Sequence, residues 1–190
     1  MSLKRNDEIV IPLSKTKVAL LLFGALAFVA VSIWIWSIAD TQNRLNPLFV
    51  KGVALAGISF FGLCGLYSCI KMFDNKPGLV IDAQGIVDNS SAVAAGRIPW
   101  DDIVGVKVYS IAGQKVLVIE VLDPQKYVER GSAFKRMLNA ANTNTIGSPI
   151  SITSNTLQIQ FDELVNILTG SLARYRETGQ TTSYRTGLSR

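Results

Sequence analysis

Residues 18–39, VALLLFGALAFVAVSIWIWSIA, form a run of 22 residues that carries no charge and no proline. A second uncharged stretch, GVALAGISFFGLCGLYSCI at residues 52–70, follows twelve residues later. About 20 apolar residues cross the roughly 30 Å hydrocarbon layer as a helix. In lipid every backbone polar group must bond within the segment, which a helix achieves. The sequence therefore predicts transmembrane helices at 18–39 and 52–70, joined by a short external loop at 40–51.

Two alternatives compete for the first stretch. A buried core helix is one, and two runs of this length argue against it. A cleaved signal sequence is the other, because Ser37 and Ala39 place small residues before a cut at Asp40. Signal h-regions, however, run about 7–15 residues. This stretch is longer and carries Trp34 and Trp36 near its end, where tryptophan prefers the headgroup layer.

Lysine and arginine near the span ends predict the orientation, because cytoplasmic loops carry the excess of these residues. Four basic residues precede the first span, and Lys71 and Lys76 follow the second. The loop between the spans holds only Arg44 and Lys51. Six basic residues outside the pair of spans, against two in the loop between them, predict that residues 1–17 and the C-terminal part of the chain lie in the cytoplasm.

The remaining composition argues against several functions. The net charge is +5, but residues 71–177 carry eleven basic and eleven acidic groups, so no nucleic-acid footprint is expected. The chain has no histidine, the commonest general base and metal ligand. Both cysteines, Cys64 and Cys69, fall inside the second apolar stretch. We therefore predict no enzyme, and no catalytic, cofactor-binding or metal-binding residues.

Residues 77–176 are typical of one small strand-rich domain. Short strands are expected at 79–82, 86–88, 104–109, 115–122, 149–153 and 156–160, with Gly85 in the first turn. A helix is expected at 127–141 and a polar loop at 139–148. A terminal helix should begin near Asp162 and bury one apolar face, formed by Leu164, Ile167, Leu168, Leu172 and Tyr175. Residues 177–190 read as a disordered tail.

A resemblance to known proteins enters with IPWDDI at 98–103, which is followed by a valine-rich strand. This element resembles a segment of bacterial pleckstrin-homology-like domains. Together with IPLSK at 11–15, PGLVID at 77–82 and PI at 149–150, it resembles a family of small uncharacterised bacterial membrane proteins. The likeness covers about residues 8–176. It implies an α+β chain: a two-helix transmembrane hairpin, then a pleckstrin-homology-like antiparallel β-barrel or sandwich capped by a C-terminal helix. It implies location in the bacterial inner membrane and no particular activity.

Two residue groups are candidate interaction surfaces. Small residues recur three or four apart along the second span, which suits close helix packing; they are Gly52, Ala56, Ser59, Gly62, Gly65 and Cys69. We expect this stripe to pack on the first span, with a partner protein or a second copy as the alternative. Basic residues around the internal helix could contact lipid headgroups, although a solvated helix face is the favoured interpretation; they are Lys126, Arg130, Lys135 and Arg136.

Two further segments have structural interpretations. Trp100 is expected in the core, with Asp101 and Asp102 in a turn or cap. As a metal site this pair is poor, because adjacent strand residues point to opposite faces. Residues 8–13 are apolar and β-branched, and should either pair with an open edge of the soluble sheet or lie in the membrane interface.

The sequence favours a non-enzymatic, membrane-tethered binding or scaffolding module. Only residues 71–75 separate the second span from Pro77, and five residues reach at most about 17 Å, which keeps the module near the bilayer. The alternative function is an accessory subunit of a larger transport or envelope complex, packing through the second helix. The expected partners are the lipid bilayer and either another membrane protein or a second copy, but not nucleic acid.

Overall fold

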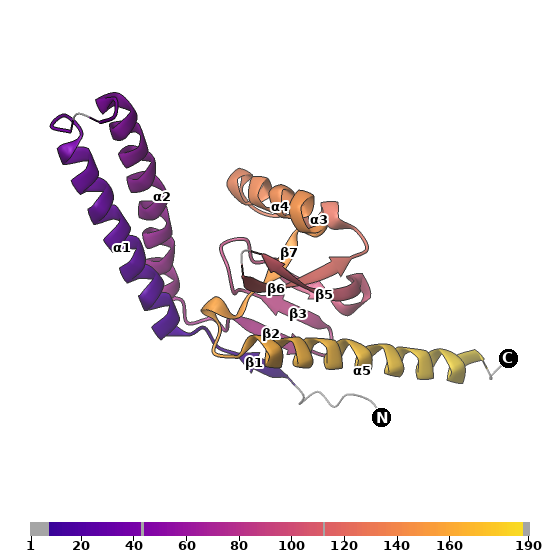
Figure 1. Cartoon of the computed structure of the whole chain (residues 1–190). Coiled ribbons are helices and arrows are strands. Elements are labelled where there is room, and N and C mark those ends of the chain that lie inside the picture. The colour runs from indigo at the N-terminus through magenta and orange to yellow at the C-terminus, as the bar shows by residue number, and fades with distance from the viewer. Residues whose placement is uncertain (1–7, 43, 112, 188–190) are drawn as a thin grey trace. The chain divides into compact units, whose positions relative to one another are not determined.

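The chain folds into two compact units (Figure 1). The computed structural model describes residues 8–42, 44–111 and 113–187. One unit is a helical hairpin, Ser14–Asn75. The other is a β-rich module that combines the described residues before Ser14 with those that follow Asn75. The hairpin is thus an insertion within the sequence of the module.

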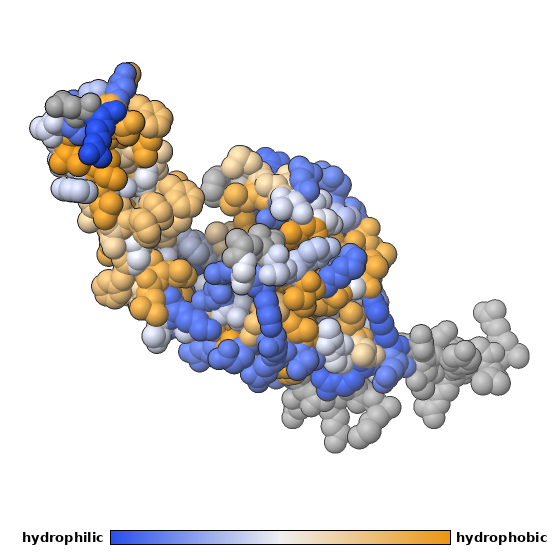
Figure 2. Space-filling view, viewed as in Figure 1, coloured by the Kyte–Doolittle hydropathy of each residue, from blue (hydrophilic) through white to orange (hydrophobic). Residues whose placement is uncertain are grey.

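The hairpin consists of α1, Lys15–Ile38, and α2, Pro47–Phe73. At 1.5 Å per residue these helices are about 36 and 40 Å long, and both are long and apolar enough to cross a membrane. Ser14 caps α1 by accepting a bond from the Lys17 N–H, and Asn46 caps α2. Large apolar side chains point outward along both helices, as Figure 2 shows. This surface suits contact with lipid rather than water.

Small residues line the seam between α1 and α2. Val18, Ala25 and Ser32 are buried at intervals of seven residues along α1. They meet α2, whose buried residues are Val50, Ala54, Gly65, Ser68 and, at the base of the hairpin, Lys71. A seven-residue spacing keeps one face of a helix on its neighbour. The closest approach is at Gly57, where an added Cβ would lie 2.5 Å from the Ser32 hydroxyl oxygen.

The β-rich module contains two antiparallel sheets. The first has the order β1-β2-β3-β4 and the second the order β5-β6-β7. The first sheet is formed by β1 Ile9–Ile11, β2 Leu79–Asp82, β3 Gly85–Asp88 and β4 Gly96–Pro99. The second is formed by β5 Ile103–Ile111, β6 Gln114–Val121 and β7 Ile150–Ile152. A 3-10 turn, Trp100–Asp102, joins them.

Three helices complete the module, and in Figure 1 the sheets lie between α4 and α5. They are α3 Pro124–Val128, α4 Ala133–Ile146 and α5 Phe161–Gly187. The single helix predicted at 127–141 is therefore wrong, since Gly131 at φ 93° interrupts it and Ser132 caps a new helix. The polar loop predicted at 139–148 is wrong for most of its length, because α4 continues to the left-handed Gly147.

The C-terminal helix closes the core as predicted. Leu164, Leu168 and Leu172 are buried, and Ile167 and Tyr175 pack against the same core. The strand predicted at 156–160 is wrong. A second 3-10 turn, Ser154–Thr156, and one isolated bridge between Leu13 and Leu157 occupy that region.

The tail predicted as disordered is helical as far as Gly187, while residues 188–190 lie outside the described part. No proline interrupts this segment, so the helix started by the packed portion continues into it.

The N-terminal segment is part of the sheet. Of the two alternatives for residues 8–13, pairing with a sheet edge is confirmed, since β1 pairs antiparallel with β2 and Val10 faces Val80. The sequence had placed this strand in a separate N-terminal segment. The observed fold is α+β, with two long apolar helices, two antiparallel sheets and a C-terminal helix. The pleckstrin-homology-like topology stays a prediction.

Candidate functional site

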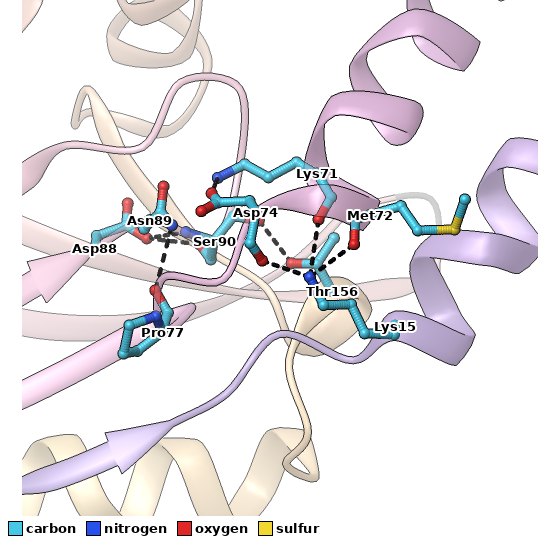
Figure 3. Close-up of polar contacts among 9 residues, drawn as sticks. All are labelled: Lys15, Lys71, Met72, Asp74, Pro77, Asp88, Asn89, Ser90 and Thr156. Carbon is cyan, nitrogen blue, oxygen red and sulfur yellow. Dashed lines mark hydrogen bonds and ion pairs between the residues drawn. The ribbon is translucent and has the colours of Figure 1, made fainter.

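The base of the hairpin is closed by Lys15 (Figure 3). Its Nζ donates to the carbonyl oxygens of Met72 at 2.9 Å, Lys71 at 3.4 Å and Asp74. The last carbonyls of a helix lack intrahelical donors and carry partial negative charge, so a lysine here stabilises the end of α2. Lys71 adds an ion pair with the Asp74 carboxylate at 3.0 Å. The two helix ends are therefore held together by charge-assisted contacts.

The opposite end of the hairpin has its own ion pair. Lys51 lies 2.7 Å from the Asp40 carboxylate and 5.9 Å from the centre of the Trp36 ring. Lys51 lies in α2, because this helix begins at Pro47, inside the segment 40–51 that was predicted to be a loop. Asp40 thus offsets one of the two basic residues at this end of the hairpin. This ion pair could not be predicted from the sequence, because Asp40 and Lys51 lie on opposite sides of the hairpin turn and not three or four residues apart on one helix.

The predicted small-residue stripe mostly faces away from α1. Gly65 alone among its members is buried in the seam, where an added Cβ would lie 3.6 Å from the Ala25 Cβ. Gly52 and Gly62 have nothing within 4 Å of an added Cβ, and Ala56 and Ser59 are exposed. Cys69 is intermediate. The expectation that the stripe as a whole packs on the first span is therefore wrong, since a different face of α2 does so. Packing of the stripe on another chain stays a prediction.

A buried carboxylate fastens the loop between β3 and β4 (Figure 3). Asp88 accepts bonds from the Ser90 N–H at 2.9 Å, the Ser90 hydroxyl at 2.6 Å and the Ala95 N–H at 2.9 Å. The Thr156 hydroxyl donates to the Ser90 carbonyl at 2.6 Å, and the Asn89 amide donates to the Pro77 carbonyl at 3.3 Å. The donors from Ser90 and Ala95 satisfy the Asp88 carboxylate, so the role of Asp88 here is to shape the loop.

Asp102 fastens α3 to the 3-10 turn. The Lys126 ammonium donates to the Asp102 carboxylate at 2.6 Å, and the Tyr127 hydroxyl donates to the same carboxylate at 2.5 Å. The Lys126 bond, followed by the Tyr127 bond, lowers the pKa of Asp102 below its usual value. Burial, followed by the bond to Asp102, raises the pKa of Tyr127. Asp102 is therefore a carboxylate and Tyr127 a neutral phenol near pH 7.

Three of the four basic residues named as possible headgroup contacts are used within the module. Lys126 binds Asp102, and Lys135 donates to the Ala94 carbonyl. Arg130 donates to the carbonyls of Ala95 at 3.2 Å and Arg97 at 2.9 Å, and its guanidinium lies 4.1 Å from the Tyr127 ring centre. Arg136 is exposed. Contact of these four residues with headgroups stays a prediction.

Trp100 is a core residue, as expected. Its indole N–H donates to the Asp82 carbonyl at 2.9 Å, and its ring stacks on Tyr175 with 6.0 Å between centroids. The Tyr175 hydroxyl donates to Asp101 at 2.7 Å. Asp101 and Asp102 thus bind different partners, which fits the turn interpretation. Within the described ranges, no group of three metal-ligating side chains comes together.

An ion pair that was not predicted from the sequence links β2 and β4 of the first sheet. Arg97 makes a two-pronged contact with Asp82, at 3.1 and 2.8 Å. This contact is the main reason that the pKa of Asp82 is lowered. Asp82 also accepts bonds from the N–H groups of Gln84 and Gly85 in the turn. An aspartate three residues before a turn glycine could have indicated this role.

Comparisons with known proteins leave the chain without a relative to reason from. No family model matched, and neither the curated proteins nor the solved structures contained a match. The feature of the chain that bears most on function is its architecture, in which a lysine-closed hairpin of two apolar helices interrupts one β-rich module.

Proposed function

We propose that this chain is a non-enzymatic protein of the bacterial inner membrane. Its hairpin spans the bilayer and holds a pleckstrin-homology-like binding or scaffolding module at the cytoplasmic face. The observation that carries the proposal is that both ends of the apolar hairpin run directly into the same soluble module. Such a module gains effective concentration for partners at the membrane without making any new contact.

The charge distribution along the hairpin supports the cytoplasmic placement. Lys15, Lys17 and Lys71 stand at the base with one acidic residue, Asp74, whereas the opposite end carries Arg44 and Lys51 with Asp40. The excess of basic residues is thus larger at the end that joins the module. The positive-inside tendency places that end in the cytoplasm.

The non-enzymatic role is supported by how the charged side chains are used. Asp82, Asp88 and Asp102 each accept several hydrogen bonds from within the module, which gives each a structural role. General acid–base catalysis needs a group within reach of a substrate proton and with a suitable pKa. The lowered pKa values of Asp82 and Asp102 keep both carboxylates ionised and weakly basic.

Cysteine labelling tests the topology. In a chain with Cys64 and Cys69 replaced by alanine, one cysteine is introduced at Arg44 in the loop or at Ala83 in the β2–β3 turn. Both positions are exposed. A membrane-impermeant maleimide added to spheroplasts should label Arg44→Cys, and should label Ala83→Cys only after the inner membrane is permeabilised. The opposite pattern, or removal of the chain by alkaline carbonate, contradicts the placement.

Partner capture tests the binding role. Mild crosslinking should capture a set of membrane-associated proteins with the full chain. A hairpin-only chain, residues 14–76, should lose the partners that depend on the module. Identical partner sets from the two chains contradict a binding role for the module.

A second candidate function is that of an accessory subunit in a larger transport or envelope complex. The observation that favours it is the exposed part of the stripe on α2, which is not used by α1. Small residues allow transmembrane helices to approach closely, and Gly52 and Gly62 have open space around them.

The stripe offers a selective test of this second function. Gly62→Leu leaves the α1–α2 seam untouched, so it should dissolve an assembly on native gels while the chain still inserts. Leu63→Phe, at an exposed neighbouring position of the same helix, is the matched control. An assembly that survives Gly62→Leu rules the stripe out as the contact.

A further inference from the structure

The module is completed by a strand that precedes the whole membrane hairpin. β1 pairs with β2 through three consecutive residue pairs, Ile9 with Ile81, Val10 with Val80 and Ile11 with Leu79. Ile11 is 4% exposed and belongs to the core, whereas Val10, on the other face of the same strand, is 51% exposed. One face of β1 is therefore an integral wall of the core.

Pro12 and Leu13, which follow β1, are also hydrogen-bonded to the segment before α5. The Gln158 N–H donates to the Pro12 carbonyl at 3.0 Å, and the Gln158 side-chain amide donates to the Leu13 carbonyl at 3.2 Å. Leu13 is buried and bridges to Leu157. An added Cβ at Gly78 would collide with Leu157 and press on Leu13, so these groups pack without spare room.

The hairpin itself prepares this pairing. Lys15 of α1 binds the carbonyls that end α2, so the two chain segments that leave the hairpin begin close together. Closing a loop that is already held at its ends costs little further chain entropy. The segments that carry β1 and β2 therefore meet at high effective concentration once the hairpin has formed.

We infer that folding of the soluble module is coupled to insertion of both membrane spans, and that β1 is the coupling element. The inference rests on the proposed transmembrane hairpin. β1 and β2 can pair when both spans have crossed but not when only one has, because a single crossing would leave them on opposite sides of the bilayer. In a chain whose first span is inserted, a folded module thus marks insertion of the second span as well. The mature protein keeps its N-terminal strand, since cleavage after the first span would remove Ile11 and Leu13 from the core.

Matched variants of the full-length chain test the role of β1. Membranes are solubilised in mild detergent, so that the module is open to protease whichever way the chain is oriented. Ile11→Asp should speed proteolysis of the module by at least about tenfold, because a core position is lost. Val10→Asp, on the exposed face of the same strand, should digest at the wild-type rate. Equal rates for the two variants overturn the inference.

A second arm tests the coupling. Arginines at Leu55 and Leu63, both exposed on α2, should block insertion of the second span. The module should then be protease-sensitive, although its own sequence is unchanged. A protease-resistant module in this variant overturns the coupling. Tags at both chain ends should appear on one full-length band, and loss of the N-terminal tag alone also overturns the inference.

The two proposals fail in different ways. If alkaline carbonate removes the wild-type chain from membranes, the transmembrane hairpin fails and the coupling fails with it. If the chain resists carbonate but Ile11→Asp behaves like Val10→Asp, only the coupling fails.

Discussion

The close approach of α1 and α2 at Gly57 gives a prediction that can be worked through quantitatively. An alanine there would place its Cβ 2.5 Å from the Ser32 hydroxyl oxygen. An alanine at Gly62 on the same helix would meet nothing within 4 Å. Each change replaces one helical glycine by alanine and adds one methyl group, so the gain in helix propensity is the same in both variants. The difference in stability between the two variants therefore isolates the contact.

The size of the effect follows from what Ser32 must do. Its hydroxyl donates to the Phe28 carbonyl at 2.8 Å, and turning away would sacrifice that bond, worth about 1 kcal/mol net. Staying in place forces the helices apart, and such overpacking costs about 1–3 kcal/mol. We expect Gly57→Ala to be less stable than Gly62→Ala by about 1–3 kcal/mol. Adding Ser32→Ala should recover most of this, because the next nearest atom, the Ser32 Cβ, lies 3.3 Å away.

The assay is reversible unfolding of purified protein in mixed micelles with rising denaturing detergent, followed by tryptophan fluorescence. Trp34 and Trp36 report on α1, and a Trp100→Phe background removes the signal of the module. The wild type, Gly57→Ala, Ser32→Ala and the double variant form a double-mutant cycle, which separates the contact between positions 57 and 32 from its surroundings. The reasoning is refuted if Gly57→Ala and Gly62→Ala unfold at the same midpoint, or if Ser32→Ala brings no recovery.

Three further predictions concern the module. Arg130→Ala should lower its unfolding free energy by about 1–2 kcal/mol, because carbonyl and ring contacts are lost. Arg136→Ala, at an exposed position, should leave the melting temperature unchanged, and equal effects would contradict the assignment. Leu168→Ala should cost about 2–5 kcal/mol as a buried side chain is truncated; a loss below 1 kcal/mol in chemical denaturation would count against the core. The pKa of Asp102 is lowered in the fold from 3.8, so its contribution is present above that pH and is lost as pH falls through the folded-state pKa. Asp102→Asn should therefore flatten the acid limb of the stability profile, and an unchanged limb would refute the role of Lys126.

Much of the fold could be predicted because its signals are local. Two uncharged runs of sufficient length mark the helices, and the apolar spacing from Leu164 to Tyr175 marks the face of α5 that packs on the core. Gly85, with φ 148°, sits in the predicted turn, where an added Cβ would collide with the backbone of Ile98. Such features depend on the chain within a few residues.

What could not be predicted depends on contacts between distant residues. The partner of β1 lies beyond the entire hairpin, so the sequence could offer the sheet edge only as one of two alternatives. The face of α2 that meets α1 is chosen by Val50, Ala54 and Gly57 rather than by the most regular run of small residues. The division of residues 127–141 into two helices depends on the left-handed Gly131 and the Ser132 cap.

The candidate sites followed the same pattern. Trp100 was recognised as a core residue from its setting before a strand. Lys126, Arg130 and Lys135 looked like a free basic face, because their acceptors lie on other elements: Asp102 and backbone carbonyls of the β3–β4 region. A basic residue read along one helix gives no sign of a carbonyl acceptor that is distant in sequence.

If the hairpin interrupts one module, β1 and β2 must be neighbours in the folded chain, and a crosslink between them detects this. Val10 and Val80 are paired, and the Cα atoms of such pairs lie about 4.5–5.5 Å apart, within disulfide range. Val87 is one strand further away, about 10 Å from Val10, and serves as the control.

The measurement uses a chain with Cys64 and Cys69 replaced by alanine and a protease site inserted in the 40–46 loop. After oxidation in membranes and cleavage of the loop, Val10→Cys with Val80→Cys should hold the two halves together on a non-reducing gel and release them with reductant. Val10→Cys with Val87→Cys should leave the halves separate. Halves that separate without reductant in the first pair, or that stay linked equally in the second, would contradict the account.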